Sequence, residues 1–123
     1  MMLFSETKEL TNHAVLLEPV GELDISTAPE FEATVDKQIA KKNYNMIISL
    51  EKLRFLDSTG VRVFIGAYKR VKPLGGRIGL VCSNPMLRRV LLVTQLENLF
   101  KIFDCTDGAI QAFMNRRPLL NGA

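Results

Sequence analysis

The chain has 123 residues, of which 47% are hydrophobic and 24% charged, with a formal net charge of +3. This composition is typical of one soluble globular domain, over 1–123, that is long enough to bury a core without disulfide bonds. Its apolar runs are short, such as Val90 to Val93, whereas a membrane span needs about 20 apolar residues. The first ten residues have neither a basic start nor a long apolar stretch, so we expect no secretion signal, no membrane association and a cytoplasmic protein.

The positive charge is weak and dispersed. Basic residues occur as scattered pairs, such as Lys41-Lys42 and Arg88-Arg89, which indicate solvated surfaces rather than a nucleic-acid patch. The chain has no Trp and only two Tyr, so aromatic side chains for base stacking are also scarce. We therefore expect no nucleic-acid partner.

The first elements are two strands and a helix. A weak strand pattern covers 3–10, a turn is expected at Thr11-Asn12, and the β-rich run 13–23 forms the next strand. Because no helix separates these two runs, they should pair antiparallel. The segment "STAPEFEATVDKQIAKK" then predicts a helix that Ser26 or Thr27 caps. Its apolar residues repeat at helical spacing: Ala28, Phe31, Val35 and Ile39.

Strands and helices alternate in the rest of the chain. The apolar run 44–50 predicts a strand covered on both faces. A helix from Thr59 to about Val71 follows, and Pro73 with Gly75-Gly76 ends it. The remaining expected elements are a strand over 77–82, a helix that Ser83 or Asn84 caps and that begins at Pro85, a strand over 99–103, a helix from 106 and a frayed tail over 117–123.

Helices of about 12 residues between strands predict parallel strands joined by right-handed crossovers. The fold class is therefore α/β, with a mixed four- to five-stranded sheet and about four helices. In the helix that begins near Pro85, two apolar stripes compete for the inner face. Either Met86, Val90 and Val93 or Leu87 and Leu91 would face inward.

Residues for common catalytic chemistry are missing. His13 is the one histidine and has no Ser or Cys partner in a recognisable setting, and no His/Cys cluster has zinc spacing. No glycine-rich segment matches a phosphate-binding loop. Cys82 ends an apolar run and should be buried. We expect no enzyme activity, no metal and no cofactor; a small enzyme that uses Asp57 or Ser58 is the weaker alternative.

The segment Asp57-Ser58-Thr59-Gly60 separates a strand from a helix. Ser58 or Thr59 could simply cap the helix, and this is a strong structural explanation. The flanking Asp57 and Gly60 favour something more, since Gly60 would let another molecule approach the Ser58 hydroxyl closely. A helix N-terminus also accommodates a phosphate, which adds about −1.5 to −2 charge. Arg62, one turn on, could partly offset that charge, and the change could release a partner.

Three segments carry a family resemblance: "VGELDISTAPEF" (20–31), the run 47–81 that contains "FLDSTGVRVF", and "LENLFKIFD" (96–104). In order and spacing they resemble the STAS-domain anti-sigma factor antagonists of bacteria, over roughly residues 12 to 115. The G-E-L-D element followed by D-S-[ST]-G is the specific part of the match. The resemblance implies a single STAS-type domain with its helices mostly along one side of the sheet.

The resemblance also implies a mechanism. The phosphorylated serine of the family corresponds to Ser58, with Thr59 as a second candidate acceptor. The unphosphorylated form would bind an anti-sigma factor of the serine-kinase type, which uses ATP, and would thereby free a sigma factor. Phosphorylation would end the complex, and a PP2C-type phosphatase would restore it. The implied partner-binding residues are Glu22, Asp24, Asp57, Ser58, Thr59, Gly60 and Arg62.

The chain departs from the family pattern at few positions. Thr59 stands where many members have Ser, Arg62 where many have a small residue, and "TQLENLF" replaces a version with more glycine. Another use of the same domain remains open, as a STAS subunit of a lipid-transport ATPase or of a stress-signalling complex. Only the partner would differ between the two uses, and the presence of Asp57 and Ser58 favours the antagonist.

Overall fold

The computed structural model describes residues 3–10 and 14–114. The elements in chain order are β1 (Leu3–Glu9), β2 (Ala14–Leu23), α1 (Ala28–Ala40), β3 (Asn45–Ser49), β4 (Leu53–Leu56), α2 (Ser58–Val71), β5 (Arg77–Val81), α3 (Pro85–Val93), β6 (Lys101–Phe103) and α4 (Thr106–Met114). Two single 3₁₀ turns, Lys72–Leu74 and Leu96–Asn98, follow α2 and α3. The turn expected at Thr11-Asn12, His13 and the tail expected over 117–123 lie outside the described residues.

The strands form one mixed sheet in the order β1-β2-β3-β5-β6, with β4 paired to β2. As predicted, β1 runs antiparallel to β2, and every other pairing is parallel. The sheet has six strands in the described part of the chain, so the expected four to five were too few. The sequence prediction missed β4, which is four residues long and pairs with the end of β2 with a register shift between Gly21 and Glu22. Only its first and last residues are buried, so its sequence lacks the alternation that predicts a strand.

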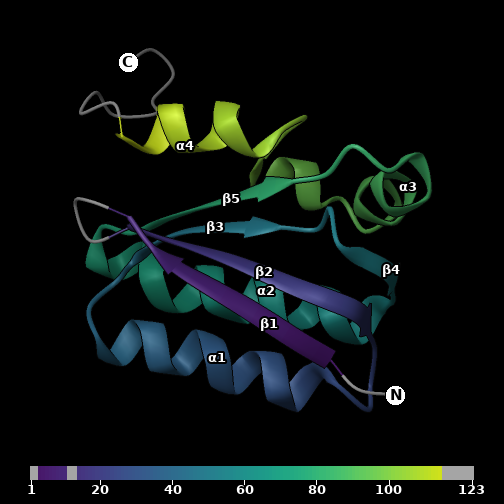
Figure 1. Cartoon of the computed structure of the whole chain (residues 1–123), viewed down its shortest axis with the longest axis horizontal. Coiled ribbons are helices and arrows are strands. Elements are labelled where there is room, and N and C mark those ends of the chain that lie inside the picture. The colour runs from purple at the N-terminus through teal and green to yellow at the C-terminus, as the bar shows by residue number, and fades with distance from the viewer. Residues whose placement is uncertain (1–2, 11–13, 115–123) are drawn as a thin grey trace.

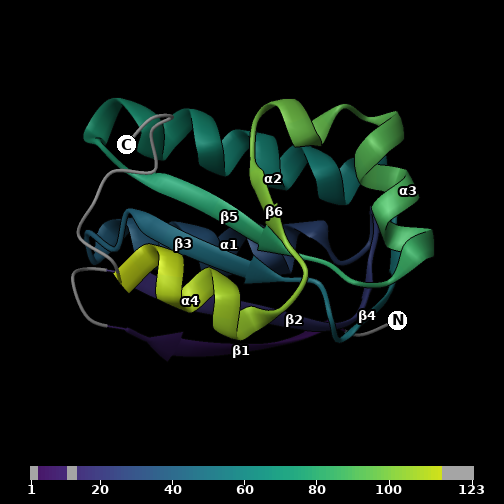
Figure 2. The same cartoon turned by 90° about the horizontal axis from the view of Figure 1, so that it is seen from above.

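The helices form two unequal layers on the sheet (Figures 1 and 2). α1 and α2 cover one face, and their core also takes in residues of α3. At its centre Phe31 and Phe64 meet edge to face, with ring centroids 6.1 Å apart. α4 alone covers the opposite face, where Phe113 packs on Leu16, Ile47 and Val81. The expectation of helices mostly along one side is therefore confirmed, and the apolar central strands are covered on both faces.

The inner face of α3 is the second of the two predicted stripes. Leu87 and Leu91 are buried in the large core, whereas Met86 and Val93 are 77% and 74% exposed. The Asn84 side chain accepts a hydrogen bond from the Met86 backbone N–H at 2.8 Å, so it caps the helix, which begins at Pro85. The helix therefore keeps a second, outward-facing set of apolar side chains.

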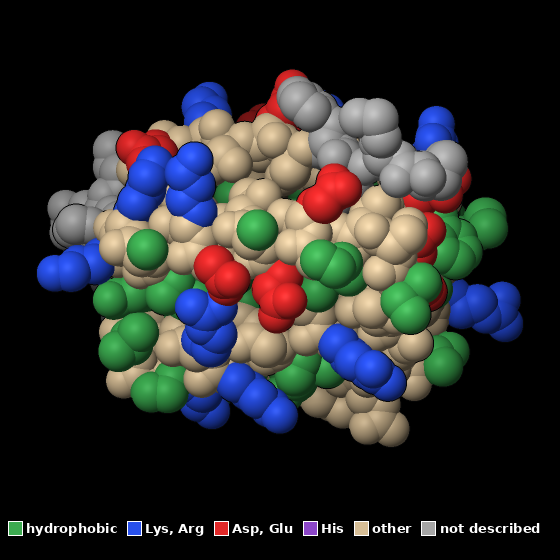
Figure 3. Space-filling view, turned by 90° about the horizontal axis from the view of Figure 1, so that it is seen from below, with side chains coloured by type: hydrophobic (Ala, Val, Ile, Leu, Met, Phe, Trp, Pro, Cys, Tyr) green, Lys and Arg blue, Asp and Glu red, His purple; other side chains and the backbone are tan. Residues whose placement is uncertain are grey.

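The parallel strands β2 and β4 end at one edge of the sheet, where α1 and α2 begin (Figure 1). In α/β sheets this carboxyl edge is where sites usually form. The outer face below the sheet, on the side of α1, shows Lys and Arg interspersed with Asp and Glu rather than one basic patch (Figure 3). We therefore look for a candidate site at the carboxyl edge of the sheet.

Candidate functional site

Asp57 is the residue that begins α2. Its backbone is extended (φ −118°, ψ −174°), and its Oδ1 accepts hydrogen bonds from the N–H groups of Thr59 (2.9 Å) and Gly60 (3.1 Å). A cap residue needs this extended backbone, whereas Ser58 already belongs to the helix. The expectation that Ser58 or Thr59 caps the helix was therefore wrong: the helix begins one residue earlier than predicted, and the aspartate takes the role.

Because Asp57 is the cap, the Ser58 side chain does not hold the start of the helix. It is exposed, and its hydroxyl makes no hydrogen bond to another residue in the part of the chain that the structure describes. It lies at the first position of a 14-residue helix, where the unpaired N–H groups and the helix dipole favour negative charge. The position can therefore take an added anion without loss of a hydrogen bond that holds the fold.

Gly60 serves packing rather than access from outside. It is buried, and a Cβ added there would lie 2.7 Å from Leu56 Cδ1 and 2.8 Å from Leu23 Cγ. The ends of β2 and β4 occupy the space that a side chain would need, so the idea that Gly60 opens a path for another molecule was wrong. The glycine instead lets the first turn of α2 lie directly on the two strands. Its part in partner binding stays a prediction.

The loop after β2 lies beside the start of α2, and hydrogen bonds within the loop stabilise its conformation. The Asp24 carboxylate accepts hydrogen bonds from the Ser26 N–H (2.9 Å), the Ser26 hydroxyl (2.7 Å) and the Thr27 N–H (3.2 Å). The fully buried Thr27 hydroxyl donates to the Glu22 carbonyl at 2.8 Å. Thr27 stands at the N-cap of α1, one of the two predicted positions, but it makes no side-chain cap bond because its hydroxyl turns back into this loop.

A backbone hydrogen bond joins the two loops, from Asp57 N–H to the Leu23 carbonyl (3.3 Å). The structure thus brings Asp24, Asp57, Ser58 and the neighbouring residues to one edge, as expected. Glu22 stands in β2 opposite Phe55 and forms a loose ion pair with Arg54, with 3.9 Å between Oε2 and Nη2. Its contact with a partner stays a prediction.

Two hollows flank the start of α2. The first, of about 370 Å³, lies between α2 and α3; Ser58, Asp57 and Arg89 line it together with apolar side chains. The second, of about 310 Å³, lies between the starts of α1 and α2, and Thr59 and Arg62 line it. Ser58 and Thr59 therefore face different hollows, each with its own arginine.

Residues 6–109 match the STAS domain family. The chain belongs to this family. The anti-sigma F factor antagonist of Paenibacillus polymyxa is 32% identical over 93 residues, which are 75% of this chain and 77% of that protein. The anti-sigma-B factor antagonist of Bacillus subtilis is 31% identical over 91 residues, 74% of this chain and 83% of that one.

Solved structures show the same fold. The anti-sigma factor antagonist SpoIIAA in its unphosphorylated form gives a TM-score of 0.74 at 24% identity, over 91% of this chain and 99% of that chain. The phosphorylated form of SpoIIAA, the Bacillus cell fate determinant, gives 0.71 at 23% identity, over 89% and 99%. No helix in the described residues of this STAS domain is long and apolar enough to cross a membrane.

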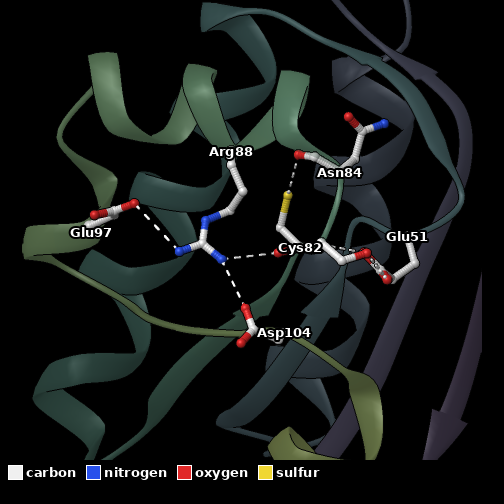
Figure 4. A network of polar contacts seen from close by, with 7 residues as sticks. Glu51, Cys82, Asn84, Arg88, Glu97 and Asp104 are labelled. Carbon is white, nitrogen blue, oxygen red and sulfur yellow. Dashed lines mark hydrogen bonds and ion pairs between the residues drawn. The ribbon is translucent and has the colours of Figure 1, made fainter.

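Polar contacts hold α3 of the STAS domain against the strand ends (Figure 4). The Arg88 guanidinium donates to the Cys82 carbonyl and to Asp104, both at 3.2 Å, and forms an ion pair with Glu97 at 3.9 Å. Glu51 accepts from the Ser83 N–H (2.8 Å) and hydroxyl (2.7 Å). Cys82 is buried, as predicted. These contacts fix the helix that forms the far wall of the first hollow.

Arg89 is the site residue that the sequence prediction missed. In the sequence, Arg89 is one half of the pair Arg88-Arg89, and such scattered basic pairs predict a solvated surface. The structure separates the two: Arg88 holds α3 in place, whereas Arg89 lines the hollow that Ser58 also lines. Arg62, expected to offset charge at Ser58, lines the hollow of Thr59 instead.

The Asp24 loop has a pH dependence that can be measured. The hydrogen bond from the Ser26 hydroxyl is the main cause that lowers the pKa of Asp24; burial opposes it, and the hydrogen bonds from the N–H groups of Ser26 and Thr27 lower the pKa further. Because the pKa is lower folded than unfolded, the carboxylate stabilises the loop above its unfolded pKa, and this is lost as pH falls through the folded pKa. We expect Ser26→Ala to raise the Asp24 pKa in an NMR titration of the carboxyl carbons. Ser83→Ala, which removes a hydroxyl bound to Glu51, should leave the Asp24 curve in place.

Proposed function

We propose that this STAS domain is a cytoplasmic, non-catalytic anti-sigma factor antagonist that phosphorylation of Ser58 switches off. In its unphosphorylated form it would bind an anti-sigma factor of the serine-kinase type and so release a sigma factor. The single observation that carries the proposal is the exposed Ser58 hydroxyl, which Asp57 relieves of the capping role. The names of the antagonists from P. polymyxa and B. subtilis support the choice of partner class.

The chemistry of the switch would belong to the partner enzymes. The kinase would transfer the γ-phosphoryl group of ATP to Ser58 Oγ: the bond to the β-phosphate oxygen breaks, a P–O ester forms, and the hydroxyl proton and ADP leave. A PP2C-type phosphatase would let water attack the ester, which releases inorganic phosphate and restores the hydroxyl. The chain itself then needs an accessible acceptor and a surface, and no cofactor.

The phosphate could be accepted without unfolding the domain. The N-terminal end of α2 is the positive end of the helix dipole, which favours a phosphate. The hydrogen bonds that cap the helix run from the Thr59 and Gly60 N–H groups to Asp57, so they do not involve the Ser58 side chain. SpoIIAA, whose fold this chain shares, has been solved in both an unphosphorylated and a phosphorylated form. Both forms share the fold of this chain, with TM-scores of 0.74 and 0.71, which supports a domain that keeps its fold when it carries the phosphate.

The proposed contact surface is the carboxyl edge of the sheet. It would include Glu22, Asp24, Asp57, Ser58, Thr59, Gly60 and Arg62. Asp24 and Gly60 would act mainly by shaping it, since the carboxylate is engaged within its own loop and the glycine is buried. Ser58, Thr59 and Arg62 would face the partner.

Affinity capture from a host lysate tests the proposal, with Ser58→Ala as bait and with ATP and ADP compared. We expect recovery of a histidine-kinase-type ATPase, retained most strongly with ADP, and phosphate on Ser58 when wild-type chain is incubated with it and ATP. Thr59→Ala reports whether the second hydroxyl is used, and Thr7→Ala on β1 is the control hydroxyl. Recovery of a transporter ATPase instead would reject the sigma-factor role while the fold assignment stands.

A further inference from the structure

The hollow between α2 and α3 combines Ser58 with two kinds of group that the proposed function does not yet use. Ser58 lies on one side and Arg89 on the other, and Met86, Val90 and Val93 of α3 supply apolar lining. Its volume of about 370 Å³ is enough for one or two side chains of another protein. The hollow is therefore a surface that a partner could fill and that a phosphate on Ser58 would change directly.

Arg89 lines this hollow without an ionic partner. Among the described residues, its side chain takes part in no ion pair or hydrogen bond, whereas the adjacent Arg88 is bound to Glu97, Asp104 and the Cys82 carbonyl. Asp57, the acidic residue that lines the same hollow, already accepts two backbone hydrogen bonds. The guanidinium is thus available to an anion that comes from outside or from Ser58.

Two of the apolar side chains that line the hollow with Arg89 are largely exposed. Met86 and Val93 expose 77% and 74% of their surface although the inner face of α3 is already filled by Leu87 and Leu91. Neighbouring exposed apolar side chains that line a hollow mark an interaction surface more often than chance exposure does. The charge beside them defines the occupant: an apolar side chain accompanied by a carboxylate, which pairs with arginine through two parallel hydrogen bonds.

Resting on the proposed function, we propose that the partner protein docks in this hollow with an apolar side chain among Met86, Val90 and Val93 and a carboxylate on Arg89. Phosphate on Ser58 then pairs with Arg89 across the hollow and displaces that carboxylate. The phosphate wins because it carries up to two charges and is tethered to the same domain, so its effective concentration beside Arg89 is high. Phosphorylation thereby occupies Arg89, which attracts the partner's carboxylate, and also adds a phosphate that repels it.

The pairing of phosphate with Arg89 can be tested without any partner. The chain is prepared with phosphoserine at position 58, and the phosphate is titrated by ³¹P NMR. An adjacent guanidinium favours the dianion, so the second pKa should lie below its ordinary value of about 6. We expect Arg89→Ala to raise that pKa by about half a pH unit or more, and Arg89→Lys to restore part of the shift.

Two matched variants control this titration. Arg62→Ala removes the arginine of the other hollow, and Lys69→Ala removes a charge from the last turn of α2, at the far end of the helix. Both should move the phosphate pKa much less than Arg89→Ala does. If Arg89→Ala leaves the titration unchanged, or if Arg62→Ala moves it more, the pairing is wrong, whatever the identity of the partner.

The docking half of the proposal is tested by affinity for the ATPase recovered in the capture experiment. We expect Arg89→Glu and Met86→Lys each to weaken binding of the unphosphorylated chain by about tenfold or more. Lys69→Glu and Leu74→Lys, which make the same changes at the far end of α2, should stay within about twofold. Wild-type affinity for both hollow variants, with Ser58 phosphorylation still releasing the partner, would reject this hollow and leave the proposed function intact.

Discussion

Phosphorylation of Ser58 should lower the affinity for the anti-sigma factor by about 100- to 1,000-fold, because like charges at an interface cost several kcal/mol and each 1.4 kcal/mol is about tenfold. The phosphate would stand next to Asp57, so at least two negative groups would share the start of α2. Isothermal titration calorimetry with phosphorylated and unphosphorylated chain measures the difference. The loss should shrink at high salt, since surface charges are then screened.

Substitutions at Ser58 bracket this effect. Ser58→Ala should bind like the unphosphorylated wild type, because the hydroxyl makes no hydrogen bond within the described residues. Ser58→Asp should weaken binding less than phosphate does, since it carries one charge and two oxygens on a shorter side chain. Equal affinity for the phosphorylated and unphosphorylated chains would contradict a switch at this residue. Unchanged amide chemical shifts away from the start of α2 would show that phosphate acts locally.

Most of the fold could be read from the sequence because its signals are local and repeated. Pro73 and Gly75-Gly76 identified where α2 ends, since the helix stops at Val71. Asn84 and Pro85 identified the start of α3, and the absence of a helix between β1 and β2 identified their antiparallel pairing. Each of these follows from neighbours in the chain.

What the sequence could not decide depends on tertiary contacts. α3 carries two apolar stripes, and only the position of the helix against β4 and the large core selects Leu87 and Leu91 as the inner one. The strand β4 was missed because it is only four residues long and its register against the end of β2 shifts after Leu53. Arg89 lies 31 positions from Ser58 in the chain, so no local pattern could bring the two to the same hollow.

The site residues show the same division. Asp57 was recognised as part of the site, but its role was assigned to the wrong residue, because Asp, Ser and Thr are all good caps and the sequence does not say which has the extended backbone. Gly60 was also recognised, yet for access rather than packing. Its neighbours Leu23 and Leu56 belong to two different strands, and they meet the glycine only in the folded chain.

Gly60→Ala and Gly66→Ala, two identical changes in α2, should therefore shift stability in opposite directions. At Gly66 a Cβ would meet nothing within 4 Å, so alanine should stabilise the helix by about 0.5–1 kcal/mol through its better helix propensity. At Gly60 the Cβ would lie 2.7 Å from Leu56 Cδ1 and 2.8 Å from Leu23 Cγ. Both leucines are buried and cannot move into solvent cheaply, so overpacking should cost about 1–3 kcal/mol.

Urea denaturation of the two variants and the wild type measures this difference, and the unfolding midpoints should fall on either side of the wild-type value. The Gly60 variant should also bind the anti-sigma factor more weakly than its stability loss explains. Relief of the clash pushes the first turn of α2 away from the strands, and that turn carries Ser58 and the N–H groups that Asp57 holds. A Gly60→Ala chain as stable as Gly66→Ala would mean that the two leucines repack freely. The first turn would then not be held against the strand ends, and the rigid presentation of Ser58 would have to come from the Asp57 cap alone.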